Sequence, residues 1–319
     1  MTHACLVVMY HYVRDSAATP FPEIRALPPA LFEQQLDWLE REHTVISLDE
    51  LDSAIQGQTV LPANAALLTF DDGFVDHYEV VFPALQRRGI RGVFFLSQQP
   101  YDDPPRVLGV HKLHFLLARL GAEALAGEVL RERVPVAAEA GARHGMVFGL
   151  DRWERPDERS LKTLVHYELP LEEAERVLDA LFVRHCGSEE AFARDLYLGE
   201  SMIAEMAAAG QSFGYHTRSH RMLSRLSDAE QASELASGVA WIEALTGQSR
   251  VAFCYPWGGP KTYNRRTVEL LDRFGYSVAF TSERRRADLS RDGRFELPRI
   301  DTRDLPPYTD AARAAEYEA

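Results

Sequence analysis

The sequence AALLTFDDG, residues 65–73, decides the fold, because an unbroken apolar run ends there in two adjacent acids and a glycine. A short run of this kind is typical of a strand that is buried on both faces of a parallel sheet. In such folds, sites are built where strands end, and Asp71 and Asp72 stand at that point. The alternative interpretation is an ordinary helix cap followed by a turn.

Strand-like and helix-like segments alternate on both sides of this run. We expect further strands at residues 5–10, 92–97, 212–216, 251–255, 277–281 and 296–300. We expect helices at residues 29–42, 74–88, 201–209, 227–246 and 264–274. The alternation indicates an α/β protein with a parallel sheet covered by helices, and it is compatible with an open sheet or with a closed barrel.

Residues 98–200 interrupt this alternation. The segment opens with prolines and continues with helical runs rich in alanine, leucine, glutamate and arginine. We therefore predict a discontinuous domain formed by residues 1–97 and 201–319. In this interpretation, residues 98–200 are a mainly helical insertion that shapes the substrate site.

Composition narrows the class of protein. The chain of 319 residues carries a formal net charge of −13, which argues against a nucleic-acid-binding role. Its three cysteines lack CxxC spacing, so a reducing compartment fits better than a disulfide framework. The apolar run near the N-terminus is too short for a secretory signal or a membrane span. We expect a cytoplasmic protein without stable membrane insertion, and the sequence does not specify its oligomeric state.

Polar clusters follow five of the expected strands. They are YHY at residues 10–12, TFDDG at 69–73, HTRSH at 216–220, YPWGG at 255–259 and RID at 299–301. Each cluster alone has an ordinary interpretation as a turn, a pair of surface histidines or a rim ion pair. A parallel barrel would bring all five to one mouth, and together they hold the carboxylate and imidazole donors that a divalent metal needs. If the sheet closes into a barrel, we therefore expect a metal site at its mouth.

Three of these clusters resemble the motifs of the polysaccharide deacetylase family, the NodB-homology or carbohydrate esterase 4 group. TFDDG, HTRSH and YPWGG occur in the family's order. The resemblance implies a distorted (β/α)7-type barrel in which Asp71 is the general base. It also implies a divalent metal, usually zinc, that is held by Asp72, His216 and His220. The backbone N–H of Trp257 would stabilise the oxyanion.

Two departures place the chain nearest to the branch of the family that has an N-terminal Tyr-His pair. Cys254 stands where the common motif has an arginine that pairs with the base, and the common C-terminal histidine acid is not visible. In that branch, typified by poly-N-acetylglucosamine deacetylases, the N-terminal histidine supplies the acid, which falls on His11 here. Arg299 is our candidate for the missing arginine.

These implied roles predict a hydrolase that removes an N-acetyl or other N-acyl group from a sugar. The expected location favours a nucleotide- or lipid-linked intermediate of surface polysaccharide synthesis. One alternative is an N-deformylase or another C–N hydrolase on the same fold. A second is a non-haem iron(II) oxygenase, since two histidines and a carboxylate also suit that metal. A non-catalytic carbohydrate-binding protein is disfavoured because all three metal ligands and Asp71 are present.

Overall fold

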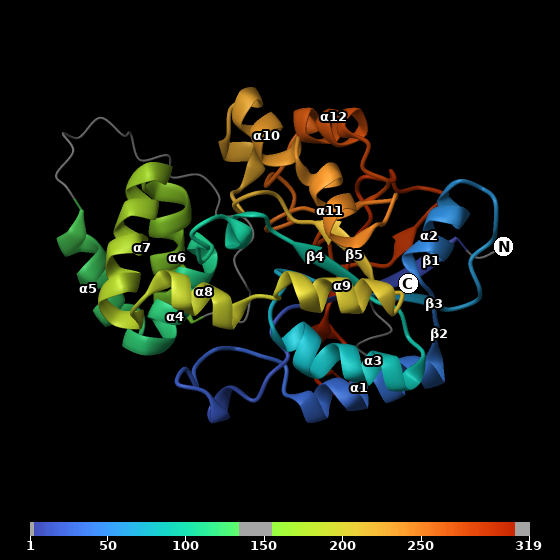
Figure 1. Ribbon diagram of the computed structural model, residues 1–319, viewed down its shortest axis with the longest axis horizontal. Coiled ribbons are helices and arrows are strands. Elements are labelled where there is room, and N and C mark those ends of the chain that lie inside the picture. The colour runs from blue at the N-terminus through green and yellow to red at the C-terminus, as the bar shows by residue number, and fades with distance from the viewer. Residues whose placement is uncertain (1–2, 134–154, 310–319) are drawn as a thin grey trace. The chain divides into compact units, whose positions relative to one another are not determined.

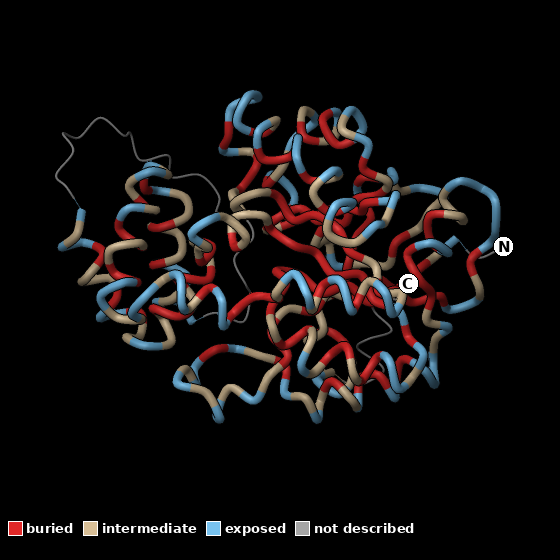
Figure 2. Tube along the Cα trace, viewed as in Figure 1, coloured by how far each residue is buried: buried red, intermediate tan, exposed pale blue. Residues whose placement is uncertain are grey.

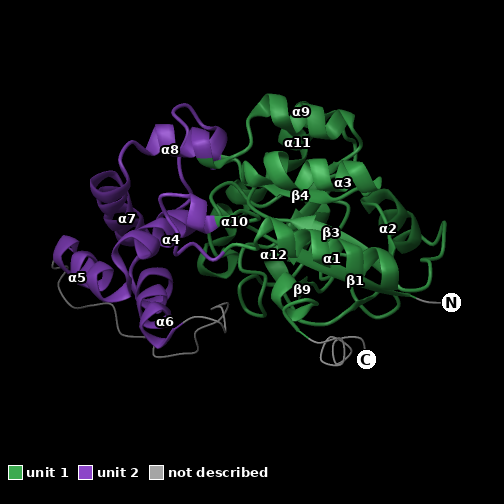
Figure 3. Cartoon of the chain, turned by 90° about the horizontal axis from the view of Figure 1, so that it is seen from below, with its two compact units in different colours: residues 1–15, 26–98, 196–319 green, residues 16–25, 99–195 purple. Residues whose placement is uncertain are grey.

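The computed structural model describes residues 3–133 and 155–309, and the chain divides into two compact units (Figure 3). Unit 1 comprises Met1–Asp15, Ala26–Gln98 and Leu196–Ala319. Unit 2 comprises Ser16–Arg25 and Gln99–Asp195. Each unit has its own internal packing, and the predicted role of the insertion in shaping the substrate site stays a prediction.

Unit 1 is built on a parallel sheet that curls back on itself (Figure 1). The parallel pairing runs in chain order through β1 (Ala4–Tyr10), β3 (Ala65–Phe70), β4 (Val93–Leu96), β5 (Ser212–Tyr215), β6 (Ala252–Cys254) and β7 (Ala279–Phe280). Phe280 then bridges Leu297, and the next residues form β9 (Ile300–Asp301), which pairs with β1. The pairing thus returns to its first strand, which confirms the predicted distorted (β/α)7-type barrel.

The distortion is visible in the pairing around β3. The first two residues of β3 pair with β2 (Thr44–Val45), whereas its last two residues pair with β4. On the other side, the start of β1 pairs antiparallel with β8 (Ala287–Asp288). The barrel therefore closes mainly through the C-terminal halves of its strands, which are the halves that carry the polar clusters.

Helices cover the barrel on its outside (Figure 1). They are α1 (Pro29–Glu42), α2 (Leu48–Ile55), α3 (Phe82–Arg88), α9 (Glu200–Ala208), α10 (Asp228–Leu235), α11 (Gly238–Thr246) and α12 (Arg265–Phe274). The prediction of one continuous helix at 227–246 is wrong, because the chain leaves helical geometry between α10 and α11. The break places Gly238 so close to Tyr276 that a Cβ would lie 2.1 Å from the phenol oxygen. Tertiary packing thus overrides local helix propensity here.

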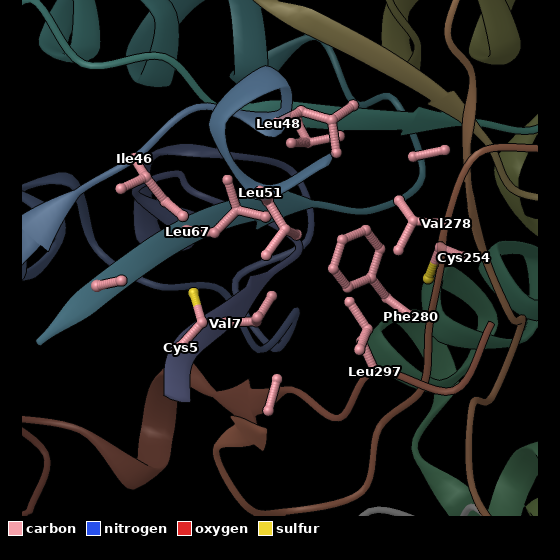
Figure 4. Close-up of a cluster of buried hydrophobic side chains, with 14 of the residues drawn as sticks. Cys5, Val7, Ile46, Leu48, Leu51, Leu67, Cys254, Val278, Phe280 and Leu297 are labelled. Carbon is pink, nitrogen blue, oxygen red and sulfur yellow. The ribbon is translucent and has the colours of Figure 1, made fainter. Parts of the chain in front are cut away.

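The strands of unit 1 are largely buried (Figure 2). Alternate strand residues fill the barrel interior with apolar side chains (Figure 4). Side chains two apart on a strand face the same side, so Cys5 and Val7 of β1 both point inward. The other inward-facing residues include Leu67, Phe95, Cys254, Val278, Phe280 and Leu297. Ile46, Leu48 and Leu51, from the β2–α2 segment, complete the cluster. The interior is therefore a packed core rather than a channel.

Unit 2 is mainly helical. Its helices are α4 (Gly109–Leu120), α5 (Ala122–Glu132), α6 (Pro156–Thr163), α7 (Leu171–Cys186) and α8 (Glu189–Leu196). Buried Lys112 on α4 pairs with Asp179 on α7 and lies 2.7 Å from Glu189. Across both units, none of the described helices combines the length and the apolar character that crossing a bilayer requires.

Candidate active site

The candidate site continues the inward-facing alternation of the barrel core to the C-terminal ends of the strands. Inward-facing Leu67 is followed, four residues on, by Asp71, and Gly214 is followed by His216. Arg299 comes two residues after inward-facing Leu297. A period of two therefore directs these polar side chains to the same space above the apolar core.

Asp72, His216 and His220 converge at this mouth. Asp72 Oδ1 lies 3.7 Å from His216 Nε2 and 3.5 Å from His220 Nε2. One ligand atom from each residue lies within 4.8 Å of the others. Metal–ligand bonds of about 2 Å allow such spacing around one ion, and a carboxylate with two imidazoles is a common donor set for zinc.

The tautomer of His216 suits a metal ligand. Its Nδ1 lies 2.7 Å from the carbonyl oxygen of Cys254, which can only accept a hydrogen bond, so Nδ1 carries the proton. The Nε2 lone pair is thereby directed towards Asp72. Burial lowers the pKa of His216, and a neutral imidazole is the form that binds metal.

The HTRSH segment is a loop, so its two histidines converge without the helical geometry that would place positions four apart on one face. Glu234 on α10 accepts a hydrogen bond of 2.9 Å from Ser219 N. Thr217 Oγ1 accepts one of 3.0 Å from His220 N. These bonds fix the loop that carries His220, and the sequence offered no signal for the role of Glu234.

Several site residues adopt left-handed backbone conformations that non-glycine residues rarely occupy. Their φ angles are 76° at Asp72, 64° at Thr217, 59° at His220 and 69° at Trp257. Such conformations cost about 1–3 kcal/mol each and cluster at functional sites, where the surrounding structure enforces them. All four belong to the motifs that the sequence singled out.

Asp71 and Arg299 form a buried bidentate ion pair. Two guanidinium nitrogens of Arg299 donate to the two carboxylate oxygens of Asp71, each at 2.7 Å. Arg299 also donates to Thr281 O at 2.9 Å and to Thr69 Oγ1 at 3.0 Å. Burial alone would raise the pKa of Asp71, but the Arg299 charge and hydrogen bonds lower it to about 2. Asp71 is therefore ionised at neutral pH.

Cys254 completes the surroundings of this ion pair. Its Sγ lies 2.9 Å from Arg299 Nη2 and 3.6 Å from Asp71 Oδ2. Asp71, His216 and Cys254 also lie close enough to form a set of metal donors. The guanidinium between Asp71 and Cys254 opposes a second positive charge there, and burial raises the pKa of the thiol well above its usual value. The set that contains Asp72 is therefore the better candidate for a cation site.

His11 lies on the solvent side of Asp71. Its Nε2 is 3.8 Å from Asp71 Oδ2, and its side chain is 43% exposed, so a substrate can reach it. Trp257 lies in the loop after β6, where its carbonyl oxygen accepts a 2.8 Å hydrogen bond from Ser282 Oγ. The Trp257 ring centre is 6.1 Å from that of His220. This loop therefore borders the candidate metal position, while the oxyanion role of the Trp257 N–H stays a prediction.

A parallel α/β barrel with carboxylate and imidazole side chains gathered at its mouth has its candidate site where enzymes of this architecture carry theirs. The family model of polysaccharide deacetylase matches residues 59–279, which is more than half of the chain. The chain belongs to the polysaccharide deacetylase family.

Individual relatives resemble parts of the chain or its fold. The poly-β-1,6-N-acetyl-D-glucosamine N-deacetylase of Escherichia coli (strain K12) is 35% identical over 83 residues, which cover 25% of this chain and 12% of that protein. The chain therefore matches only a small part of that relative.

Two solved structures share the fold over nearly the whole chain. The Streptococcus pyogenes deacetylase PplD, in complex with acetate, superposes with a TM-score of 0.61 at 17% identity and full coverage of both chains. A de-N-acetylase from Aggregatibacter actinomycetemcomitans gives 0.59 at 16%, covering 98% of this chain and 99% of that chain.

Proposed function

We propose that this protein is a metal-dependent hydrolase that removes an N-acetyl group from an N-acetylated sugar. The proposal rests on one observation. Asp72, His216 and His220 form a set of donors that suits a metal, and the ionised Asp71 lies beside this set without belonging to it. The Escherichia coli relative is named as a deacetylase of poly-β-1,6-N-acetyl-D-glucosamine, which supports an N-acetylglucosamine unit as substrate. A nucleotide- or lipid-linked sugar stays our narrower prediction.

The donor set fits a divalent ion such as zinc, which Asp72, His216 and His220 would hold. When bound, such an ion supplies Lewis acidity, which polarises the acyl oxygen and makes water a stronger acid. Zinc sites with three protein ligands leave a position open for water or substrate. Hydrolysis then needs a proton acceptor for the attacking water and a proton donor for the departing amine.

Asp71 is the proposed acceptor and His11 the proposed donor. Arg299 orients both oxygens of Asp71 and holds this acid ionised. Because the pKa of Asp71 is about 2, the acid binds a proton only transiently. Protonated His11 gives its proton to the sugar nitrogen as the C–N bond breaks, which releases acetate and a free amine. Since His11 Nε2 lies 3.8 Å from Asp71 Oδ2, a small movement returns the proton from the acid to the imidazole.

The backbone N–H of Trp257 is the proposed donor to the oxygen that becomes negative during attack. The Ser282 contacts hold this loop in place: Ser282 Oγ donates to Trp257 O and Ser282 N donates to Gly258 O, each at 2.8 Å. Gly258 has no room for a side chain, because a Cβ would lie 2.7 Å from Ser282 N. A donor of this type is worth about 3–4 kcal/mol in the transition state.

The test is mass spectrometry of products from a panel of N-acetylated and N-formylated sugars, free, polymeric, nucleotide-linked and lipid-linked. We expect release of acetate rather than formate, loss of turnover after chelation, and its recovery on adding zinc. Asp71→Asn should bind metal but lower turnover by about 10²–10⁴-fold, as for removal of a general base. Normal deacylation by that variant, or turnover that survives complete metal removal, would refute the proposal.

A further inference from the structure

The loop that carries His11 lies against the turn that follows the two acids. Residues 11–14 leave the end of β1, and residues 74–77 follow Asp71, Asp72 and Gly73 in the chain. The rings of Tyr12 and Phe74 stack with centroids 3.9 Å apart and planes within 20°. The segment after the acids therefore contacts the proposed acid loop directly.

Asp76 fixes the far end of the same loop. Its Oδ2 accepts hydrogen bonds from Val13 N at 3.2 Å and from Arg14 Nε at 2.7 Å. Asp76 is only 5% exposed, so these charge-assisted bonds lie away from bulk water. Asp76 thus holds Val13 and Arg14 in place, and a separate contact holds the backbone of His11.

We infer that His77 is a positioning residue that sets the backbone of His11, and the inference rests on the proposed role of His11 as the acid. His77 Nε2 lies 3.0 Å from the carbonyl oxygen of His11. A carbonyl can only accept, so the proton of the imidazole is on Nε2. This bond fixes the peptide unit from which the His11 side chain extends towards Asp71.

The surroundings of His77 argue against a role in stability alone. The side chain is fully buried and lies among the rings of Phe70, Phe74 and Phe94. Among the described residues, its Nδ1 has no hydrogen-bond partner, and leaving a buried polar atom unsatisfied costs about 1–3 kcal/mol. A phenylalanine would fill such an aromatic cage without that cost, so the single bond to His11 is what the imidazole provides.

The local backbone is also irregular at this residue. A π-helical turn (His77–Val81) precedes α3, where a regular helix would have been expected for residues 74–88. π-helical turns are rare overall, and many of those that occur lie at functional sites. Here the turn starts at the residue that reaches His11, so the irregularity coincides with the proposed positioning contact.

The test is a double-mutant cycle with steady-state kinetics. His77→Phe should keep the cage packed and remove the donor, whereas His77→Gln retains an N–H at similar reach. We expect H77F to lower kcat by at least about 10-fold with KM changed less than about 2-fold, because a small misplacement of a reacting group lowers the rate without weakening binding. H77Q should recover most of that loss.

The His11→Ala background separates positioning from a general effect on folding. If His77 acts through His11, H77F should change kcat by less than about 2-fold in H11A, because coupled residues are not additive. His77→Leu serves in the same cycle if H77F does not fold. Gln211→Leu, which removes a buried amide bonded to backbone at the opposite end of the strands, should leave kcat unchanged.

Three results would overturn the inference. Wild-type kcat in H77F, or an equal loss of kcat in the presence and absence of His11, would show that His77 does not act through His11. Failure of H77Q to restore kcat above the level of H77F would point to packing. Wild-type kcat in H11A would instead show that His11 is not the acid of the proposed function. The kcat of H11A is therefore measured first.

Discussion

The interior of the barrel and its mouth are made by the same strands, yet they have opposite chemistry. The inward-facing positions deep in the barrel are apolar, such as Val7 and Leu67. Towards the ends of the strands the inward-facing positions become polar: Thr69 precedes Asp71 at the end of β3, His216 follows β5, and Arg299 directly precedes β9. The comparison shows that one period-two pattern builds both regions, and that only the ends of the strands carry charge.

The two regions contribute differently to the free energy of folding. Burying the apolar interior stabilises the fold by about 25 cal/mol for each Å² removed from water. The mouth contains a fully buried Asp71–Arg299 pair, and such pairs often add little net stability because both charges lose their hydration. The apolar interior therefore provides most of the stability, whereas the buried ion pair at the mouth is arranged for the proposed reaction.

The largest expected effect follows from removing one partner of the buried pair. Arg299→Met leaves the carboxylate of Asp71 buried without its counter-charge, which should lower the free energy of unfolding by about 3–5 kcal/mol. Urea-induced unfolding measures this change. The double variant Asp71→Leu with Arg299→Met should regain most of that stability yet stay inactive. A double variant as unstable as the single one would contradict the comparison.

A substitution in the barrel interior should lower the stability of the protein without changing metal content or activity at the site. Leu67→Ala removes a fully buried side chain below Asp71 and should cost about 3 kcal/mol of unfolding free energy. Metal content and kcat at 25 °C should remain within about 2-fold of wild type, because no ligand or proton donor has changed. Loss of bound metal from a folded Leu67→Ala protein would show that interior and mouth are not separable.

Lowering the pH should lower the free energy of unfolding through protonation of Asp71 at the barrel mouth. The pKa of Asp71 is lowered from its usual 3.8 to about 2. The contribution of ionised Asp71 to the free energy of unfolding is therefore complete above pH 3.8 and is lost as the pH falls towards 2. The loss attributable to this group is on the order of 2 kcal/mol. Unfolding measured from pH 5 to pH 2 should show less of this loss in the double variant Asp71→Leu with Arg299→Met. An identical pH dependence in the two proteins would contradict the assignment.

The smallest expected effect concerns Cys254, which stands where the common motif has an arginine. Its thiol contacts Arg299 without supplying a charge, so Cys254→Ala should cost about 1 kcal/mol of stability. Activity should stay within about 3-fold of wild type, since the Arg299 bonds to Asp71 are retained. A loss of activity as large as that of Arg299→Met would mean that the thiol takes part in the reaction.

The sequence predicted most of the strands because each is a short apolar run that ends in a turn. It also predicted which residues stand at the strand ends, since Asp71 and His216 directly follow such runs. The break between α10 and α11 was not predictable, because it depends on the approach of Gly238 to Tyr276. The short strands β2 and β8 have only two residues each, too few for a periodic pattern.

The geometry within the site was less accessible to sequence reasoning. Adjacent acids can point together or apart, and only the positive φ of Asp72 turns it to the histidines while Asp71 faces Arg299. The supporting contacts of Glu234 and His77 join segments that are distant in sequence, and neither lies in a recognised motif. Local patterns located the site, whereas tertiary contacts determine how its side chains are held.

The most direct test of the central claim is the metal content of two neighbouring variants. Asp71→Asn and Asp72→Asn make the same chemical change at adjacent residues, and both purified proteins are equilibrated with zinc, desalted and analysed by elemental mass spectrometry. We predict one zinc ion per chain in the wild type and in Asp71→Asn, and at most about a tenth of that in Asp72→Asn, because losing even an outer-shell partner weakens metal binding about 10–100-fold and Asp72 is itself a proposed ligand. Equal zinc in the two variants, or loss from Asp71→Asn alone, would contradict the account.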